Sequence, residues 1–271
     1  MSDVLDRVKG VLVGLAAGDS NGGPIRMAVR LGESLLENRG FDRTDVMERY
    51  MEWYRDGAFD TGVVADLVFS RVAVGQSFEF AARAVHMDLD NRTGGCNPAH
   101  RNAPLAMCFQ IDDADLAKNA LLEAALTHFD PIAGDVSAAV VTLCRQLIKG
   151  VTWHEAIDIS ADGRSVHTKA AFRRTTMDDL DRGGYAPDVL TAAIHFLEHA
   201  GTFSEALNAS MEFAGLSNFC PVLVGSIGGA RWGAKAVSHE RSQDGDLHSF
   251  VEVVSAGLGA EWEMAGGASV E

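Results

Sequence analysis

The stretch that decides the fold runs from Arg7 to Pro24 and reads RVKGVLVGLAAGDSNGGP. Apolar residues recur in it at helical spacing until a polar, glycine-rich break, which predicts a helix over residues 3–18. Gly10, Gly14 and Gly18 repeat at every fourth position. On a helix this spacing places all three on one face, so the first helix should present a strip without side chains.

A second glycine row stands near the other end of the chain, at Gly225, Gly229 and Gly233. A glycine inside a helix destabilises it by about 1 kcal/mol relative to alanine. The two rows together are therefore costly unless a favourable contact compensates for them. Backbone-to-backbone packing without intervening Cβ atoms provides one. We therefore predict that these two helices lie close to other elements, each other included. Chance enrichment is the alternative, and the charged residues among the glycines argue against a membrane dimer motif.

Helical patterning covers most of the remaining chain, and β patterning is almost absent. We predict an all-α fold of one domain over residues 1–257 and a flexible acidic tail over 258–271. Residues 158–184 are polar and irregular. Further helices are expected at 44–55, 62–74, 77–86, 113–128, 132–149, a short stretch after the capping box that starts at Thr152, 187–200, 203–213, 222–237 and 247–257.

Composition narrows the choice of partners and compartment. The formal net charge is −15, which repels nucleic-acid backbones but leaves a small phosphate-bearing ligand possible in a basic pocket. No 18-residue stretch is free of charge, so no membrane association is expected, and the acidic start of the chain does not resemble a secretory signal. The four cysteines lack zinc spacing. We expect a cytoplasmic protein with free thiols, and the oligomeric state stays open.

The opening segment, R-x-x-G-x-x-x-G-x-x-A-G-D-S-x-G-x-P, resembles the first signature of the ADP-ribosylglycohydrolases, a family that includes the dinitrogenase-reductase-activating glycohydrolases and the J1-crystallins. Further segments resemble this family in the same order, and together they cover most of the chain. They are Tyr54-x-x-Gly57-x-Phe59-Asp60-Thr61, Arg101-x-x-Pro104-Leu105-Ala106, Thr127-His128-x-Asp130-Pro131, Gly184-Tyr185 and residues 215–234.

The resemblance implies an orthogonal all-α bundle with a central cleft. Members of the family hydrolyse an N- or O-glycosidic bond at the anomeric carbon of ADP-ribose, typically with two magnesium ions. A Thr-Asp-Asp motif and an Asp-x-Asp-Thr motif hold those ions.

This sequence departs from the family at both metal motifs. Ala58 and Phe59 stand where the first motif has its threonine and first aspartate, so only Asp60 remains. At the second motif both aspartates are absent, Asn218 is a weak neutral substitute, and Phe219 replaces the threonine. Magnesium needs near-octahedral oxygen ligation. We therefore predict that the dinuclear magnesium site is absent and that no metal or other cofactor is used.

Four residues are candidates for chemistry without a metal. A ribosyl bond can break through an oxocarbenium-like state that carboxylates stabilise. The resemblance places Asp19 and Asp60 in the cleft and directs the loop with His128 and Asp130 toward it. Three of them also have a structural alternative: Asp19 could cap the following turn or bond Arg26, Asp60 could cap a helix, and His128 could make a structural hydrogen bond.

Five residues are candidates for substrate binding. Arg26 stands where the family usually has an acid and would place a positive charge at the cleft mouth, which suits a phosphate or carboxylate. Arg101 could bind an anion, or pair with an acid under its loop. Asn218 could bind ribose hydroxyls, or cap the next helix. Phe59 and Phe219 either fill the cleft or line an open pocket.

Two functions follow from this pattern. The first is a metal-independent glycosidase-like hydrolase acting on a ribosylated or ADP-ribose-like small molecule. The alternative is a non-catalytic protein on the same fold, either structural or a pseudo-enzyme that binds ADP-ribose or a nucleotide. The polar residues retained at cleft positions favour the enzyme, and the lost ligands favour the alternative.

Overall fold

The structure is a computed structural model that describes residues 3–237 and 245–267. In those two ranges the chain forms helices and no strand, and its one β-type contact is an isolated antiparallel bridge between Gly95 and Tyr185. The all-α prediction is confirmed. The helices are α1 Asp3–Gly18, α2 Gly23–Asn38, α3 Arg43–Arg55, α4 Val63–Ala73, α5 Phe78–Asp88, α6 Asn97–Arg101, α7 Pro104–Met107, α8 Asp113–Ala124, α9 Pro131–Ile148, α10 Trp153–Ala161, α11 Val166–Ala170, α12 Ala186–His199, α13 Phe203–Ala214, α14 Phe219–Trp232 and α15 Gly245–Gly267, with 3₁₀ turns at Met177–Asp179 and Ala234–Ala236.

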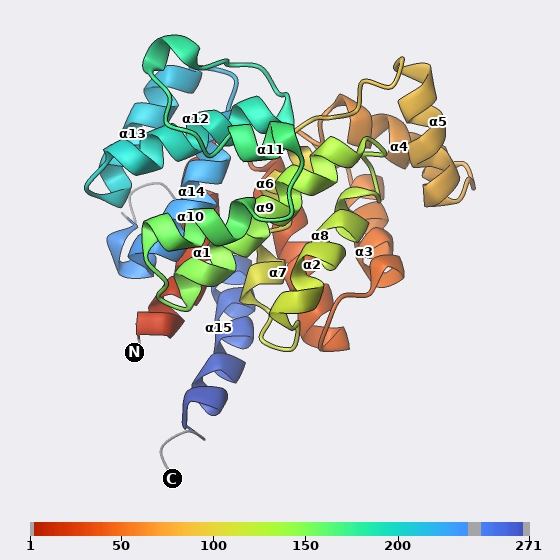
Figure 1. Ribbon diagram of the computed structural model, residues 1–271. Helices are drawn as coiled ribbons and strands as arrows, with labels where there is room; N and C mark the ends of the chain where they lie inside the picture. The colour runs from red at the N-terminus through yellow and green to blue at the C-terminus, as the bar shows by residue number, and fades with distance from the viewer. Residues whose placement is uncertain (1–2, 238–244, 268–271) are drawn as a thin grey trace.

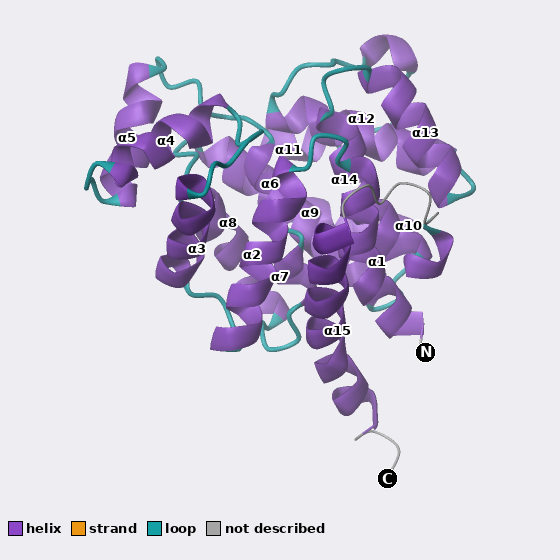
Figure 2. Cartoon of the chain, turned by 180° about the vertical axis from the view of Figure 1, so that it is seen from behind, coloured by secondary structure: helices purple, strands orange, loops and turns teal. Residues whose placement is uncertain are grey.

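The helices surround α9, which lies in the middle of the bundle in both views (Figures 1 and 2). On one side α4 and α5 form a projecting hairpin, and on the other side α12 and α13 form a second lobe. Helix α9 is long and apolar enough by length and composition to cross a membrane, but 72% of it is buried inside the protein. Its apolarity is therefore that of a central core helix.

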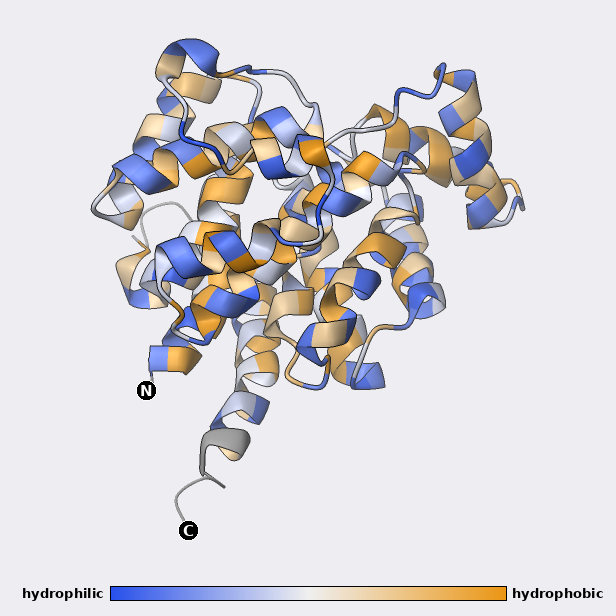
Figure 3. Cartoon of the chain, viewed as in Figure 1, coloured by the Kyte–Doolittle hydropathy of each residue, from blue (hydrophilic) through white to orange (hydrophobic). Residues whose placement is uncertain are grey.

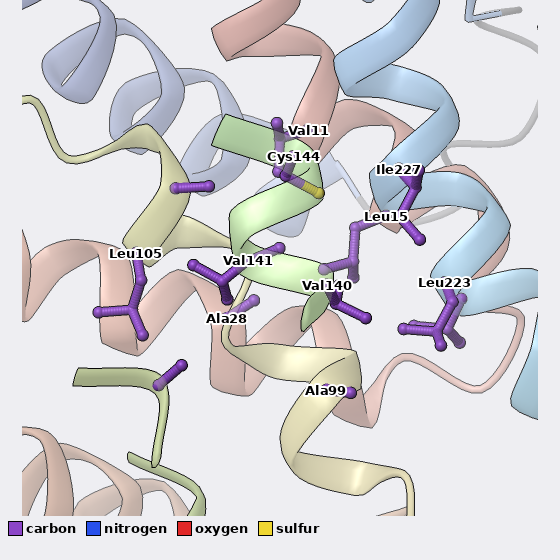
Figure 4. Packing of buried hydrophobic residues seen from close by; sticks show 14 of the residues in the cluster. Val11, Leu15, Ala28, Ala99, Leu105, Val140, Val141, Cys144, Leu223 and Ile227 are labelled. Carbon is purple, nitrogen blue, oxygen red and sulfur yellow. The ribbon is translucent and has the colours of Figure 1, made fainter. Parts of the chain in front are cut away.

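One continuous apolar core joins these elements. In the close view, Val140 and Cys144 of α9 lie among residues of α1 and α14, including Leu15 and Ile227 (Figure 4). All four of these residues are inaccessible to solvent. Helices nearer the surface carry hydrophobic and hydrophilic residues on the same helix (Figure 3), as amphipathic helices do. The division into a single domain stays a prediction.

The two glycine rows meet. A Cβ atom added at Gly14 would collide with the carbonyl oxygen of Gly225, and one added at Gly10 would collide with that of Gly229. Helices α1 and α14 thus touch through their backbones, which confirms the prediction of close packing. Gly233 differs from the other members, because it follows the end of α14 at φ 83° and packs against the Asp6 side chain.

Several predicted elements differ from the structure. The helix expected at 113–128 ends at Ala124, and the stretch 158–184, which looked irregular, contains the end of α10, α11 and a 3₁₀ turn. Helix α2 was not predicted, because the glycines and Pro24 after α1 looked only like a break in the chain. In the structure Gly22, at φ 92°, precedes α2, and Pro24 lies in its first turn, where proline is well tolerated. The helix expected at 222–237 starts earlier, at Phe219, and ends at Trp232. The predicted tail from residue 258 continues α15 as helix to Gly267, while residues 268–271 lie outside the described residues.

Packing explains the last of these differences. Leu258 is 1% exposed, and the indole N–H of Trp262 donates to the carbonyl oxygen of Met107 at 2.7 Å. The glycines of this segment suggest a flexible coil. In the structure, however, side chains of α1 pack on Gly259 and a side chain of α2 packs on Gly257. The missing Cβ atoms therefore allow α15 to pack closely against these helices.

Candidate functional site

The turn between α1 and α2 is built on Asp19. Its Oδ1 accepts hydrogen bonds from the backbone N–H groups of Asn21 and Gly22 at 3.2 and 2.8 Å, and its Oδ2 accepts from that of Ile25 at 2.9 Å. The side chain is 8% exposed. Asp19 therefore caps the first turn of α2 with both of its oxygens engaged, which is the structural alternative considered for this residue.

Asn218 ties the start of α14 to the same turn. Its Nδ2 donates to Asp19 Oδ1 at 3.2 Å, and its Oδ1 accepts from the Ser20 hydroxyl at 2.8 Å. Asn218 has φ 51°, a left-handed conformation that asparagine tolerates better than most residues. The amide is thus held on both sides, and it is 7% exposed. We refer to Asp19, Ser20, Asp60 and Asn218 as the Asp19 cluster.

Asp60 is the exposed carboxylate of the Asp19 cluster. It also has a left-handed backbone, at φ 51°, and its main chain lies against Gly23, where a Cβ would collide with it. Partial burial and the nearby charge of Asp19 raise the pKa of the Asp60 carboxyl, while hydrogen bonds from Asn21 and the Gly23 backbone oppose that shift. Strained, non-glycine residues of this kind concentrate at functional sites.

Arg26 and Phe59 lie beside Asp60. The Arg26 guanidinium stands 4.9 Å above the centre of the Phe59 ring and donates to the Gly22 carbonyl at 3.0 Å. Phe59 also meets Trp53 edge-to-face and is 45% exposed. Arg26 and Trp53 extend from Phe59 into a cavity of about 150 Å³ between α2, α3 and α15, whose lining residues are Arg26, Val29, Arg30, Trp53, Asp246, Leu247 and Phe250.

The residues at the family's metal positions do not fit a pair of magnesium ions. Phe59 carries a cation on its face, and the Asn218 amide already makes hydrogen bonds within the chain. Asp60 is the one carboxylate these positions retain. Within residues 3–237 and 245–267, no group of three or more His, Cys, Asp or Glu side chains is arranged to hold a metal ion. A hard divalent ion needs more oxygen ligands than this set provides.

A second polar group is buried between α3, α6 and the end of α8. Arg101 Nε donates to Glu123 Oε1 at 2.6 Å, and the Tyr50 hydroxyl donates to the same oxygen at 2.9 Å. Arg101 Nη2 donates to Thr127 Oγ1 at 2.9 Å, and Thr127 Oγ1 lies 2.9 Å from His128 Nδ1. We call these five residues the Arg101 network. Each of them is at most 2% exposed.

The position of Arg101 does not fit the predicted ligand contact. Its side chain is 1% exposed and is paired with an acid, Glu123, which is the alternative considered for it. The sequence could not identify that acid, because Glu123 lies in another helix. Buried arginines are rare unless paired, so the network needs both charges.

His128 Nε2, on the far side of the ring from the Arg101 network, lies beside Gly95. A Cβ added at Gly95 would lie 3.4 Å from His128 Nε2 and 3.8 Å from Asn97 Oδ1. Asn97 in turn donates to the carbonyl oxygen of Thr61, the neighbour of Asp60, at 3.3 Å. The segment around Gly95 therefore connects the two groups of polar residues.

The remaining two predicted residues border this segment. Asp130 caps α9, because its Oδ1 accepts from the Ile132 N–H at 3.0 Å. Phe219 stacks on His100 with ring centres 6.4 Å apart and lies against Gly184. Phe219 therefore packs against the backbone bridge that joins residues 94–96 to 184–186.

Sequence reasoning missed four residues around the site: Tyr50, His100, Glu123 and Tyr185. His100 is 2% exposed, and burial lowers its pKa to about 3. Tyr185 is 43% exposed, and partial burial together with the charges of Asp130 and Asp188 raises its pKa. His100 adjoins the Arg101 segment and Tyr185 belongs to the Gly184-Tyr185 segment, which was an available signal. Tyr50 and Glu123 lie on helical faces that look like ordinary core and surface positions.

Comparison with known proteins identifies the family and the fold of the chain. The family model described as ADP-ribosylglycohydrolase matches residues 25–246. The chain belongs to the ADP-ribosylglycohydrolase family. The match begins just after the Arg7–Pro24 signature, so the assignment stands on the rest of the chain. The Asp60, Arg101 and His128 segments all lie inside the matched range.

A solved structure titled "ADP-ribosylglycohydrolase-related protein complex" is similar to this chain with a TM-score of 0.78 and 23% identity. The alignment covers 96% of this chain and 99% of that one. At this identity the likeness establishes a shared ADP-ribosylglycohydrolase fold. No curated protein sequence matches the chain.

Proposed function

We propose that this ADP-ribosylglycohydrolase family member is a glycosidase-like hydrolase that acts on a ribosylated or ADP-ribose-like small molecule without a metal ion. The observation that supports this most directly is Asp60. It is an exposed carboxylate on a strained backbone, and its pKa is raised by burial and by Asp19. A carboxylate of this kind is a better proton acceptor than an ordinary surface aspartate.

In the proposed reaction the bond between the anomeric carbon of ribose and its leaving group breaks, and the oxygen of a water molecule bonds to that carbon. Asp60 accepts a proton from this water and stabilises the positive charge that develops on the ring. The leaving group takes up a proton from solvent. Asp19, predicted as a catalytic residue, has the role of holding the turn in this proposal, because both of its oxygens are hydrogen bonded.

Arg26 and Phe59 are the proposed binding residues beside Asp60. A guanidinium lying on an aromatic ring presents its edge to anions, which suits a phosphate group. The neighbouring cavity is lined by Arg30, Trp53 and Phe250, whose charge and aromatic surface suit the rest of a nucleotide-like ligand.

A non-catalytic ADP-ribose-binding protein is the second candidate. It is favoured by the pairing of Arg26 with Phe59 at the family's first metal motif, since this pairing suits binding of an anion without any chemistry at the anomeric carbon. The two candidates differ in turnover and not in binding.

The deciding experiment is a thermal-shift titration with ADP-ribose, with and without millimolar magnesium, followed by a turnover assay. A ligand that binds only the folded state at 100 times its Kd stabilises it by about 2.7 kcal/mol. We expect the same rise in Tm with and without magnesium. A rise that requires magnesium would contradict the proposal of metal independence, and no rise would contradict ADP-ribose as the ligand class.

The turnover assay compares Asp60→Asn with Asp56→Asn, an exposed acid in the same loop. Loss of a general base typically lowers the rate about a hundredfold or more. We expect that loss in Asp60→Asn alone, with ADP-ribose binding retained. Binding without turnover in the unmodified protein would favour the non-catalytic candidate.

A further inference from the structure

The Arg101 network ends at His128, and the order of its hydrogen bonds decides which ring nitrogen of His128 carries the proton. Arg101 is a donor only, so Thr127 Oγ1 must accept the bond from Arg101 Nη2. The threonine hydroxyl has one hydrogen, and its neighbour at 2.9 Å is His128 Nδ1. The hydroxyl therefore donates to Nδ1, which acts as the acceptor.

The opposite tautomer would leave two polar groups without partners. With a hydrogen on His128 Nδ1, the Thr127 hydroxyl hydrogen would have no acceptor that the described residues provide. Nε2 would then be a buried acceptor, and no donor in the described part of the chain reaches it. It would be the second polar atom without a partner. Buried polar groups without partners are costly, so the chain of donors that starts at Arg101 selects the tautomer with hydrogen on Nε2.

Burial and the charges around His128 keep the ring neutral. Arg101 and His100 face it from α6, Glu123 at the end of α8 is engaged by Arg101 and Tyr50, and Asp130 is hydrogen bonded as the cap of α9. Burial, followed by the charges of Arg101 and His100, lowers the pKa of His128 well below its usual value. An imidazolium at this position would place a second cation beside a buried guanidinium.

We propose that Arg101 and Thr127 are positioning residues that hold His128 as a neutral imidazole with its hydrogen on Nε2, so that His128 presents a fixed hydrogen-bond donor to the ligand. This inference rests on the proposed function for the ligand, but the tautomer itself does not. The Nε2 atom is buried beside Gly95 and has no partner in the described residues, so its hydrogen is the one that remains for a ligand oxygen. His128 then serves as a donor to a ribosyl or phosphate oxygen, and it does not accept a proton.

This assignment also gives the buried charges of the Arg101 network a role. Replacing a buried ion pair by apolar residues is often neutral for stability, so an ion pair does not have to be present for the fold. Here the guanidinium supplies the hydrogen bond that orients Thr127, and Thr127 orients the imidazole. Second-sphere partners fix histidine tautomers in this way at other sites.

The test uses ¹⁵N NMR of histidine side chains in the full chain, where His128→Gln identifies the His128 signal among the nine histidines. We expect an unprotonated Nδ1 and a protonated Nε2, unchanged between about pH 5.5 and 8, a range that spans the ordinary histidine pKa. Thr127→Ser should preserve this signature, since it keeps the hydroxyl. Thr127→Val, nearly equal in size to threonine, should lose it.

Binding of ADP-ribose by the same variants connects the tautomer to the ligand. Loss of one hydrogen bond to a fixed donor corresponds to about a tenfold weaker Kd, which we expect for Thr127→Val and not for Thr127→Ser. A His128 signal with hydrogen on Nδ1, or one that titrates in this range, would overturn the inference even in the unmodified protein, so misfolding of a variant does not prevent the test.

The two proposals fail in different ways. Should the Nε2 tautomer be observed while no variant binds ADP-ribose, the positioning role of Arg101 and Thr127 stands and the proposed ligand is wrong. Equal ADP-ribose affinity in Thr127→Val and Thr127→Ser, with the tautomer lost only in the valine variant, would overturn the donor role of His128.

Discussion

The Asp19 cluster and the Arg101 network are both polar groups at the matched family motifs, but their hydrogen bonds differ. In the Asp19 cluster, the oxygens of Asp19 and the amide of Asn218 are engaged by the chain, mostly by backbone N–H groups of one turn. In the Arg101 network, His128 Nε2, Arg101 Nη1 and Glu123 Oε2 have no partner in the described ranges. Asp19 and Asn218, which are satisfied by the chain, hold the turn that carries Asp60, whereas a side chain with a remaining donor, such as His128, can itself serve a ligand.

Removing one charge from the Arg101 network should have the largest effect on stability. Glu123→Ala leaves the Arg101 guanidinium buried without its counter-charge, and we expect a loss of about 3–5 kcal/mol in the free energy of unfolding by urea. The double variant Arg101→Met, Glu123→Leu should recover most of this loss, because it removes both charges. Equal destabilisation in the two variants would mean that packing, and not the charge, holds this region.

Asp19→Ala tests the other side of the comparison. It leaves buried N–H groups of the turn without acceptors, so we expect a loss of about 3 kcal/mol in the free energy of unfolding. Asp56→Ala, which removes an exposed acid, should change stability by less than about 0.5 kcal/mol. Asn218→Ala removes the side chain that donates a hydrogen bond to Asp19. If Asp19 accepted a proton in the reaction, this variant would shift the pH profile of turnover. We expect no such shift.

The contact between α1 and α14 supports the Asp19 cluster, because it sets the distance between Asp19, in the turn after α1, and Asn218, at the start of α14. Gly14→Ala would drive a Cβ into the Gly225 backbone, with an expected loss of about 2 kcal/mol measured by chemical unfolding. At Gly245 nothing lies within 4 Å of an added Cβ, so Gly245→Ala should be neutral or slightly stabilising. A neutral Gly14→Ala would show that the two helices can separate without cost.

Asp60→Asn should have the smallest effect and the most specific pH dependence. The pKa of Asp60 is raised in the folded protein above its ordinary value of 3.8, so the native state binds this proton more tightly than the unfolded chain does. Its contribution to stability therefore falls as pH rises from about that value. At pH 7 the free energy of unfolding of Asp60→Asn should exceed that of the unmodified protein by less than about 1 kcal/mol. Near pH 3 the part of this difference that comes from the pKa of Asp60 should disappear.

The backbone of Asp60 provides the control for that measurement. Asparagine also tolerates a left-handed φ, so any gain from the backbone is independent of pH and cancels when the two pH values are compared. A difference in stability that does not change with pH would contradict the raised pKa. A gain in stability together with a loss of turnover would be typical of a residue retained for function.

The sequence by itself determined the helical class, the family and the close packing of the two glycine rows, and it predicts the loss of the metal ligands. Each of these depends on residue identity at a fixed spacing, such as Gly10 to Gly14, or on replacement of an oxygen ligand by a ring, as at Phe59 and Phe219. Such features are local, because helix periodicity and ligand chemistry do not require knowledge of distant contacts.

The tertiary structure decided which polar residues remain able to act. Arg101 and Asp60 looked equivalent as candidates, yet Arg101 meets Glu123 and Tyr50 in the core, and Asp60 stays exposed at a strained turn. The same holds for α15, whose glycine-rich end is ordered by contacts with α1, α2 and Met107. Burial and hydrogen-bond partners come from residues tens of positions away in the chain, and a motif carries no information about them.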